Sequence, residues 1–256
     1  MPAPVYVLDG RKCTMPSAVR VRSAEEVSRA YADKKHSVWL APDDASLRLL
    51  LETVRVGKPR HALLSLKKVS LARRGLLDAL FAVVVEPTVT KMLPPDELRE
   101  VLVADNREDL FVAAHAVPED DALVLFRGDL RSLIVPLSSF KAKKGGAKPD
   151  PRKISVMDYG QTIRLGAYEV AADALLYELD PEARRRARRR EIDADDSLGA
   201  SIRRLRLQKG LSRDDFGPLS AKTIARIERG ETEPRGTTLA TISGTLGVET
   251  DQLRSF

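Results

Sequence analysis

Between Ser220 and Arg229 the chain carries small, polar and cationic side chains at a spacing that suits nucleic-acid recognition. On a helix, Ile224 and Ile227 would point inward and leave the other side chains outward. Short side chains let such a helix approach base edges in a major groove, where Arg or Lys can meet guanine or phosphate. We therefore expect the following residues to form a nucleic-acid-binding face: Ala221, Lys222, Thr223, Ala225, Arg226 and Arg229.

An apolar stripe predicts a helix before this face. Leu198, Ile202 and Leu205 recur at positions i, i+4 and i+7, which is the spacing of one side of a helix. Lys209-Gly210 would end this helix. Its opposite side is expected to hold three arginines: Arg203, Arg204 and Arg206.

A second, short helix is expected to open at Ser212. The Ser212 hydroxyl can cap the free amides, and Asp215 follows three residues later, as in a capping box. Ser220 would cap a third helix, which Gly230 would end. A further helix with inward apolar residues would complete the core: Leu239, Ile242 and Leu246.

These elements together resemble a known domain. The segment from about residue 197 to residue 253 is similar to the helix-turn-helix domain of the Cro and lambda-repressor type, also called Xre-like. Its sharpest part is Thr223-Ile224-Ala225-Arg226-Ile227-Glu228-Arg229-Gly230, which looks like the recognition-helix signature of that family. Three later motifs stand where the family has them: Glu233-Pro234, Thr238-Leu239 and Leu246-Gly247-Val248.

The resemblance implies which residues meet double-stranded DNA. Bases or nearby phosphates would be contacted by Ser220, Lys222, Thr223 and Arg226, and the backbone by Arg213. We add Arg229 and Arg235 to this DNA-binding set. Modules of this family usually act in pairs, so the resemblance also implies a homodimer on a two-fold site.

The chain departs from the family pattern in one place. Between Ser212 and Thr223 it is a few residues shorter, and it lacks the glycine that normally makes the turn between the second and third helices. The second helix is therefore expected to be clipped to a single turn, which puts the Arg213 contact in question. The alternative interpretation of the segment is a small helical bundle that packs on another protein.

An arginine run precedes this segment. Residues 181–256 hold 16 Lys and Arg against 12 Asp and Glu, so most of the formal net charge of +6 lies there. Such an uneven charge is typical of nucleic-acid binding joined to a second task. Within the run we expect auxiliary phosphate contacts from Arg184, Arg185, Arg188 and Arg189. The alternative is a solvated helical linker, because acidic residues follow at once and could pair with the arginines.

The composition excludes several protein classes. A chain of 256 residues with 43% hydrophobic and 31% charged residues is ordinary for a soluble globular protein of about two domains. Cys13 is the only cysteine, which rules out an intramolecular disulfide and fits a reducing cytosol. The longest apolar run, residues 79–85, is too short to cross a bilayer. We expect a cytoplasmic protein with no membrane partner.

The middle of the chain is predicted to be α+β. Strands are expected at residues 122–126, 132–136, 153–157 and 162–165, with a hairpin turn at Gly128-Asp129 and a helix over residues 170–179. Residues 110–180 are similar to a small uncharacterised bacterial α+β domain often associated with this kind of helix-turn-helix. That resemblance rests on Arg127-Gly-Asp129, Val135-Pro-Leu137 and the run from Asp158 to Gly166 with Tyr168. It implies a sensing or interaction role.

The first hundred residues alternate between strands and helices, which favours an α/β fold with a partly parallel sheet. Strands are expected at residues 5–8, 37–40 and 62–66, and helices at residues 24–35, 44–56 and 71–80. Asp9, Asp43 and Asp44 follow strands, where α/β proteins often place functional carboxylates. A nuclease or phosphoacceptor site is the enzymatic alternative, but no phosphate-binding glycine loop accompanies these acids, and turns or helix caps explain them.

We find no pattern for a metal, a cofactor or a catalytic residue. Asp129, Asp158, Glu169 and Asp173 show no recognised ligand spacing, and three histidines are scattered singly: His36, His61 and His115.

The sequence thus predicts an α/β and α+β N-terminal region followed by an all-α helix-turn-helix domain. The expected domains are residues 1–100 (α/β), 101–180 (α+β), 181–196 (charged helical linker) and 197–256 (helix-turn-helix). The predicted function is a sequence-specific transcriptional regulator, a repressor or autoregulator, whose N-terminal region dimerises, senses a ligand or docks a partner. The alternative is an antitoxin or adaptor that binds a protein partner and autoregulates its operon.

Overall fold

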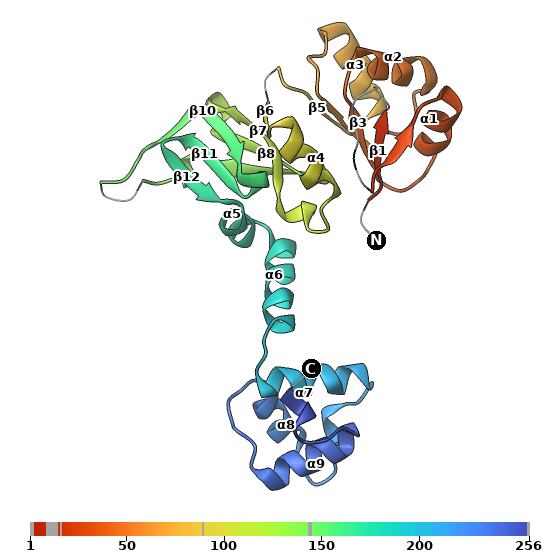
Figure 1. Cartoon of the computed structure of the whole chain (residues 1–256). Helices are drawn as coiled ribbons and strands as arrows, with labels where there is room; N and C mark the ends of the chain where they lie inside the picture. Colours follow the sequence, from red (N-terminus) through yellow and green to blue (C-terminus); the bar gives the residue numbers. More distant parts are fainter. Residues whose placement is uncertain (1–2, 9–14, 16, 89, 143–144, 255–256) are drawn as a thin grey trace. The chain divides into compact units, whose positions relative to one another are not determined.

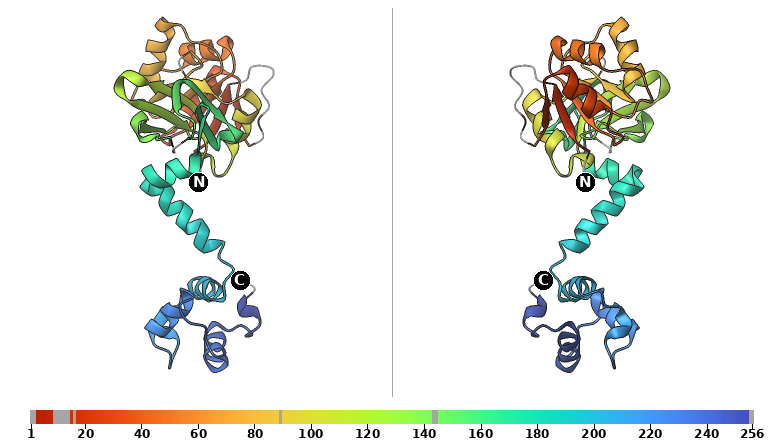
Figure 2. Two further views of the ribbon diagram at one scale, coloured as in Figure 1. Left: turned by 90° about the vertical axis from the view of Figure 1, so that its left-hand side faces the viewer. Right: turned by 90° about the vertical axis from the view of Figure 1, so that its right-hand side faces the viewer.

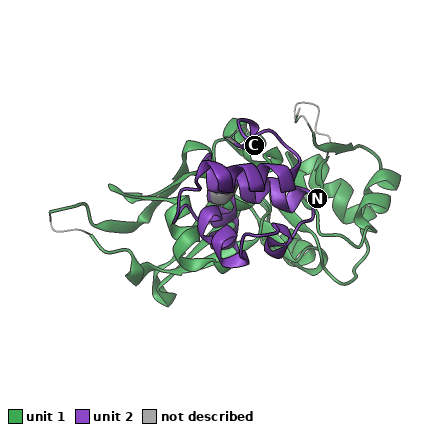
Figure 3. Ribbon diagram, turned by 90° about the horizontal axis from the view of Figure 1, so that it is seen from below, with its two compact units in different colours: residues 1–181 green, residues 182–256 purple. Residues whose placement is uncertain are grey.

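The computed structural model describes the chain except residues 1–2, 9–14, 16, 89, 143–144 and 255–256, so Asp9 and Cys13 lie outside it. The described chain divides into two compact units, residues 1–181 (unit 1) and residues 182–256 (unit 2), which Figure 3 colours separately. The expected α/β and α+β domains both lie in unit 1. Within the described part of the chain, none of the helices combines the length and apolarity needed to cross a membrane.

The first part of unit 1 is a five-stranded parallel sheet in the order β2-β1-β3-β4-β5. This confirms the predicted α/β class. All four residues of β3 and of β4 are buried, which is why these strands appear as continuous apolar runs in the sequence. The elements are β1 (Val5–Leu8), β2 (Val19–Val21), α1 (Ala24–Tyr31), β3 (Val38–Ala41), α2 (Asp44–Thr53), β4 (Ala62–Ser65), α3 (Leu71–Leu80) and β5 (Val83–Val85).

Side-chain caps fix the starts of these helices. Ser23 caps α1 in a capping box with Glu26, Asp43 caps α2 and Ser70 caps α3. Helices α1 and α2 end a few residues earlier than predicted, because residues 32–35 and 55–56 are exposed and have no core to join. Strand β2 was not predicted. It is a three-residue edge strand with two exposed residues, so it shows no alternating pattern.

The second part of unit 1 contains two antiparallel sheets, β6-β7-β8-β9 and β10-β11-β12, with β10 lying against β7 (Figure 1). The four predicted strands are confirmed as β8 to β11. Strand β7 was missed because its alanines give a weak strand signal. The elements are β6 (Lys91–Met92), α4 (Pro95–Val103), η1 (Arg107–Asp109), β7 (Phe111–Val117), η2 (Pro118–Asp120), β8 (Ala122–Arg127), β9 (Ser132–Pro136), η3 (Leu137–Ser139), β10 (Pro149–Met157), η4 (Asp158–Gly160), β11 (Thr162–Gly166), β12 (Tyr168–Ala171) and α5 (Ala172–Leu179).

The turn between β10 and β11 is sterically demanding. Asp158 and Tyr159 both have a φ of 52°, and Gly160 follows with a φ of 81°. A Cβ atom on Gly160 would lie 2.3 Å from the carbonyl oxygen of Phe111, so only glycine fits there. The predicted helix over 170–179 begins only at Ala172, because Val170 is used in the ladder between β12 and β11.

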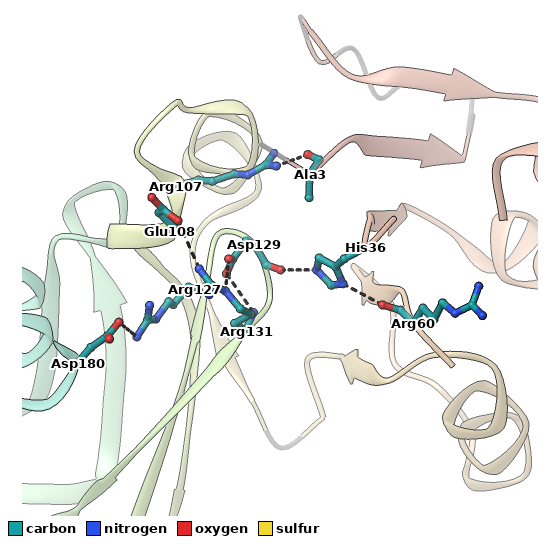
Figure 4. Close-up of polar contacts among 9 residues, drawn as sticks. All are labelled: Ala3, His36, Arg60, Arg107, Glu108, Arg127, Asp129, Arg131 and Asp180. Carbon is teal, nitrogen blue, oxygen red and sulfur yellow. Dashed lines mark hydrogen bonds and ion pairs between the residues drawn. The ribbon is translucent and has the colours of Figure 1, made fainter. Parts of the chain in front are cut away.

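Two polar contacts join the two parts of unit 1 (Figure 4). The His36 ring lies between two carbonyl oxygens, with Nδ1 2.9 Å from Arg60 and Nε2 3.2 Å from Asp129. The buried Arg107 guanidinium donates to the carbonyl oxygen of Ala3. The turn at Gly128-Asp129, predicted as a hairpin tip, is therefore an internal contact surface of unit 1.

His61 is a core histidine with a partner at each ring nitrogen. Nε2 donates to the Tyr31 carbonyl oxygen at 2.9 Å, because a carbonyl can only accept. Nδ1 lies 2.7 Å from the Ser37 hydroxyl, which accepts from the Trp39 indole at 2.9 Å. Burial lowers the pKa of His61, so the neutral ring is the form that the fold favours.

We expect unit 1 to lose stability as the pH falls below about 6.5, the ordinary pKa of an unfolded histidine. Because the folded pKa of His61 is lowered, the unfolded chain takes up the proton first. The contribution of His61 to the free energy of unfolding is complete at a pH above the unfolded pKa. It decreases as the pH falls from the unfolded pKa to the folded pKa. Denaturant unfolding followed by Trp39 fluorescence at pH 7 and pH 5 checks this. The loss should be smaller in His61→Gln, and an unchanged loss would contradict the assignment.

Unit 2 is all-helical. Its helices α7, α8 and α9, blue in Figures 1 and 2, surround one apolar core. The core is formed by Ile202, Leu205, Phe216, Ile224, Ile227, Ile242, Leu246 and Leu253. The elements are α6 (Pro181–Asp193), which begins at the last residue of unit 1, α7 (Leu198–Gln208), η5 (Arg213–Asp215), α8 (Ala221–Glu228), α9 (Gly236–Leu246) and η6 (Gln252–Arg254).

Candidate nucleic-acid interface

The second helix of unit 2 is a single 3₁₀ turn, η5, as the shortened sequence predicts. The expected capping box is present. The Ser212 amide donates to Asp215 Oδ2 at 2.6 Å, and the Asp214 amide donates to Ser212 Oγ at 3.2 Å. The hydrogen bonds from Ser212 lower the pKa of Asp215. The expectation that this turn lacks a glycine is wrong, because Gly217, directly after Phe216, has a φ of 60° and makes the left-handed turn toward α8.

Helix α8 places its residues as the sequence predicts. Ile224 and Ile227 are buried, while Lys222 and Arg226 are exposed one helical turn apart. The rest of this outward side is partly exposed and carries only small groups: Ala221, Thr223 and Ala225. The result is a low, cationic surface that a nucleic-acid groove can approach closely.

Ser220 and Thr223 are tied to the start of α8. The Ser220 hydroxyl caps the helix by accepting from the Thr223 amide at 3.1 Å and lies 2.9 Å from the Thr223 hydroxyl. Both residues therefore stabilise the N-terminus of α8. They also lie at the end of the helix that is expected to contact DNA. A helix N-terminus also presents free amides, which suits contact with phosphate.

Three further arginines of the expected set have defined positions in unit 2. Arg213 pairs with Glu228, with Nη2 2.8 Å from Oε2, and its side chain is 41% exposed. Arg229, directly after α8, pairs with Glu231, with Nε 2.6 Å from Oε1. Arg235 is exposed and stands at the start of α9. The structure thus brings Arg213 and Arg229 beside α8, both paired with acids, and places Arg235 at the start of the next helix.

A buried ion pair, which sequence reasoning missed, orients α8. The Glu228 carboxylate is 1% exposed and accepts from Arg206 Nε at 2.6 Å. Arg206 also donates to the carbonyl oxygen of Leu211 at 2.9 Å. The expectation that Arg206 lies on the exposed side of α7 is wrong, because its guanidinium is drawn inward by Glu228. Since Glu228 also holds Arg213, one carboxylate joins α7, η5 and α8.

Close backbone packing supports the same geometry. A Cβ atom on Gly199 of α7 would lie 2.2 Å from the carbonyl oxygen of Ile227. Only glycine lets the two helices approach this closely. The buried ion pair could have been predicted from the position of Glu228, because this acid shares the inward side of α8 with Ile224 and Ile227.

The arginines expected to contact phosphate lie on helix α6. Arg185, Arg188 and Arg189 are exposed, and Arg184 is half-buried. The helix confirms the predicted helical structure of this charged segment.

Asp43 and Asp44, two of the acids that follow strands of unit 1, have structural roles. Asp43 caps α2 by accepting from the Ser46 amide at 2.8 Å and hydroxyl at 2.7 Å, which lowers the pKa of Asp43. Asp44 pairs with Arg73 at 2.9 Å. Among the residues that the structure describes, no three His, Cys, Asp or Glu side chains come together as a metal ligand set. Asp43 and Asp44, the two nuclease candidates that the structure describes, therefore belong to no such set.

Comparison with known families agrees with the geometry of unit 2. Residues 202–253 match a family model described as helix-turn-helix. No curated protein and no solved structure is significantly similar to the chain. Residues 202–253 of this chain are a helix-turn-helix domain of the Xre and lambda-repressor type.

Proposed function

We propose that the protein is a cytoplasmic, sequence-specific DNA-binding transcriptional regulator that represses or autoregulates its own promoter. The observation that carries this proposal is the exposed side of α8, where Lys222 and Arg226 flank small residues while Ile224 and Ile227 anchor the helix. The match of residues 202–253 to a helix-turn-helix model supports it.

Binding would combine two kinds of contact. Arg213 and the exposed arginines of α6 would meet phosphates, which adds affinity without sequence information. Lys222, Thr223 and Arg226 would enter the major groove and discriminate between bases. The Arg206–Glu228 pair holds α8 at the required angle.

Binding of the full-length protein to its own upstream DNA tests the proposal. Affinity should be measured at two salt concentrations against a shuffled DNA of equal composition. We expect the native sequence to bind at least tenfold more tightly at both salts. Equal, steeply salt-dependent binding to both DNAs would reduce unit 2 to a basic surface and overturn the proposal.

Glu231 gives a further expectation. Its carboxylate lies 2.6 Å from Arg229 and 3.8 Å from Arg226, beside the proposed DNA surface. Replacing Glu231 by Gln removes a negative charge near phosphate, so affinity for both DNAs should rise by about 2- to 5-fold. Glu25→Gln makes the same charge change on α1 of unit 1 and should leave affinity unchanged. Weaker binding by Glu231→Gln would contradict this placement.

A further inference from the structure

Helix α3 exposes apolar side chains to solvent. Leu71 is 91% exposed and Leu76 is 57% exposed. Three small residues complete what we call the apolar face of α3, which consists of Leu71, Ala72, Gly75, Leu76 and Ala79. A contiguous exposed apolar patch is a common mark of an interaction surface.

The helical periodicity makes this face continuous. Successive residues are about 100° apart around a helix, so the five members occupy adjoining positions. Leu77 and Leu80 point to the opposite side and are buried. Surface helices normally place polar residues away from the core, but here the charged pair Arg74 and Asp78 stands only at one border of the face. Helix α3 therefore presents apolar residues toward solvent as well as toward the core, beside its three charged residues, Arg73, Arg74 and Asp78.

Gly75 stands in the middle of this face. No heavy atom lies within 4 Å of a Cβ atom built on it, so packing inside unit 1 does not require glycine. A glycine inside a helix costs about 0.5–1 kcal/mol relative to alanine. On the exposed side of the helix, the missing side chain would let another backbone approach closely.

We propose that a second copy of this chain covers the apolar face, with the two α3 helices antiparallel about a two-fold axis at Gly75. The choice of a second copy rests on the proposed function, because helix-turn-helix modules bind two-fold sites in pairs. A two-fold contact needs a surface that complements itself. Around an axis at Gly75, Leu71 of one copy meets Ala79 of the other, so a large residue faces a small one.

The border of the face is also self-complementary. The axis brings Leu76 of the two copies together at one border. At the other border, Arg74 of one copy lies beside Asp78 of the second copy, because the axis reverses the helix direction. Arg74 Nε and Asp78 Oδ1 are 2.9 Å apart within one chain, so the arginine already points along this border. Each arginine would then have an acid of its own chain and an acid of the second copy as neighbours, which offsets the approach of the two arginines across the axis.

The mass of the full-length protein by light scattering tests the proposal. We expect the wild type to be a dimer of 28.2 kDa chains. Leu71→Glu should weaken dimerisation at least tenfold without unfolding, because an acid in the first turn of a helix is favourable. Val56→Glu is the matched control, since Val56 is 78% exposed on unit 1 outside the face, and it should remain dimeric.

A cross-link defines the axis. In a Cys13→Ser background, Gly75→Cys should form a disulfide-linked dimer on mild oxidation, whereas Val56→Cys should not. A monomeric wild type, a dimer that Leu71→Glu leaves intact, or equal cross-linking at both positions would overturn the proposal and leave the face to another partner.

Failure of this inference is distinguishable from failure of the proposed function. A dimer that depends on Leu71 but shows no preference for its own DNA would retain the interface and reject the regulator. A monomer that prefers its own DNA and protects one half-site would retain the regulator and reject the interface.

Discussion

Glu228→Ala is expected to destabilise the helix-turn-helix domain by about 3–5 kcal/mol, the usual result of removing one partner from a buried ion pair. In the wild type, Arg206 Nε lies 2.6 Å from Glu228 Oε1. The change would leave the Arg206 guanidinium buried without this carboxylate. It also removes the carboxylate that holds Arg213 of η5. Because small domains have only about 5–15 kcal/mol of stability, most of unit 2 would open frequently.

Hydrogen–deuterium exchange of the full-length protein measures this effect unit by unit. Peptides from residues 197–253 should lose protection in Glu228→Ala, while peptides from the parallel sheet of unit 1 keep it. Glu231→Ala removes an exposed acid from the same unit and should leave this protection close to that of the wild type. Wild-type protection of α7 and α8 in Glu228→Ala would contradict the role of the pair.

The paired replacement Arg206→Met with Glu228→Leu separates charge from structure. Replacing both ions by apolar residues of similar size is often close to neutral, because no buried charge is left unpaired. We therefore expect the double variant to recover most of the lost protection. A double variant as unstable as Glu228→Ala would show that the loss came from packing around α8.

Arg226→Ala is expected to weaken binding to the native upstream DNA by about 10- to 100-fold, equivalent to 1–3 kcal/mol for a base-reading arginine. Its side chain is 52% exposed on the outward side of α8. The preference for native over shuffled DNA should fall with it. Lys222→Ala should also weaken binding to the native DNA more than to the shuffled DNA, because Lys222 is exposed on the same side of α8 and would read bases.

Arg20→Ala provides the matched control for Arg226→Ala. Arg20 is an exposed arginine on the edge strand β2, far along the chain from unit 2. Removing its charge should leave both affinities unchanged. Electrophoretic mobility or fluorescence anisotropy titrations of all three variants decide the outcome. If Arg226→Ala keeps the wild-type preference for native over shuffled DNA, Arg226 on α8 does not read bases.

The sequence determined the local structure of unit 2. Ser212 with Asp215, Ser220 before α8 and the glycine after α8 are signals that act within a few residues, so the helix boundaries could be predicted. The buried strands β3 and β4 were equally clear, because a parallel strand buried on both sides must be apolar throughout. The sequence by itself also determined which residues of α8 face outward.

Only the tertiary structure decided which charged residues are buried. A helical pattern placed Arg206 with Arg203 and Arg204 on an exposed side, but Glu228, 22 residues later, makes burial of Arg206 favourable. The same holds for β7, whose alanines become a strand through pairing with β8. Such outcomes depend on partners distant in sequence, and a local pattern carries no information about them. The caps and apolar spacings could be predicted because their partners are neighbours.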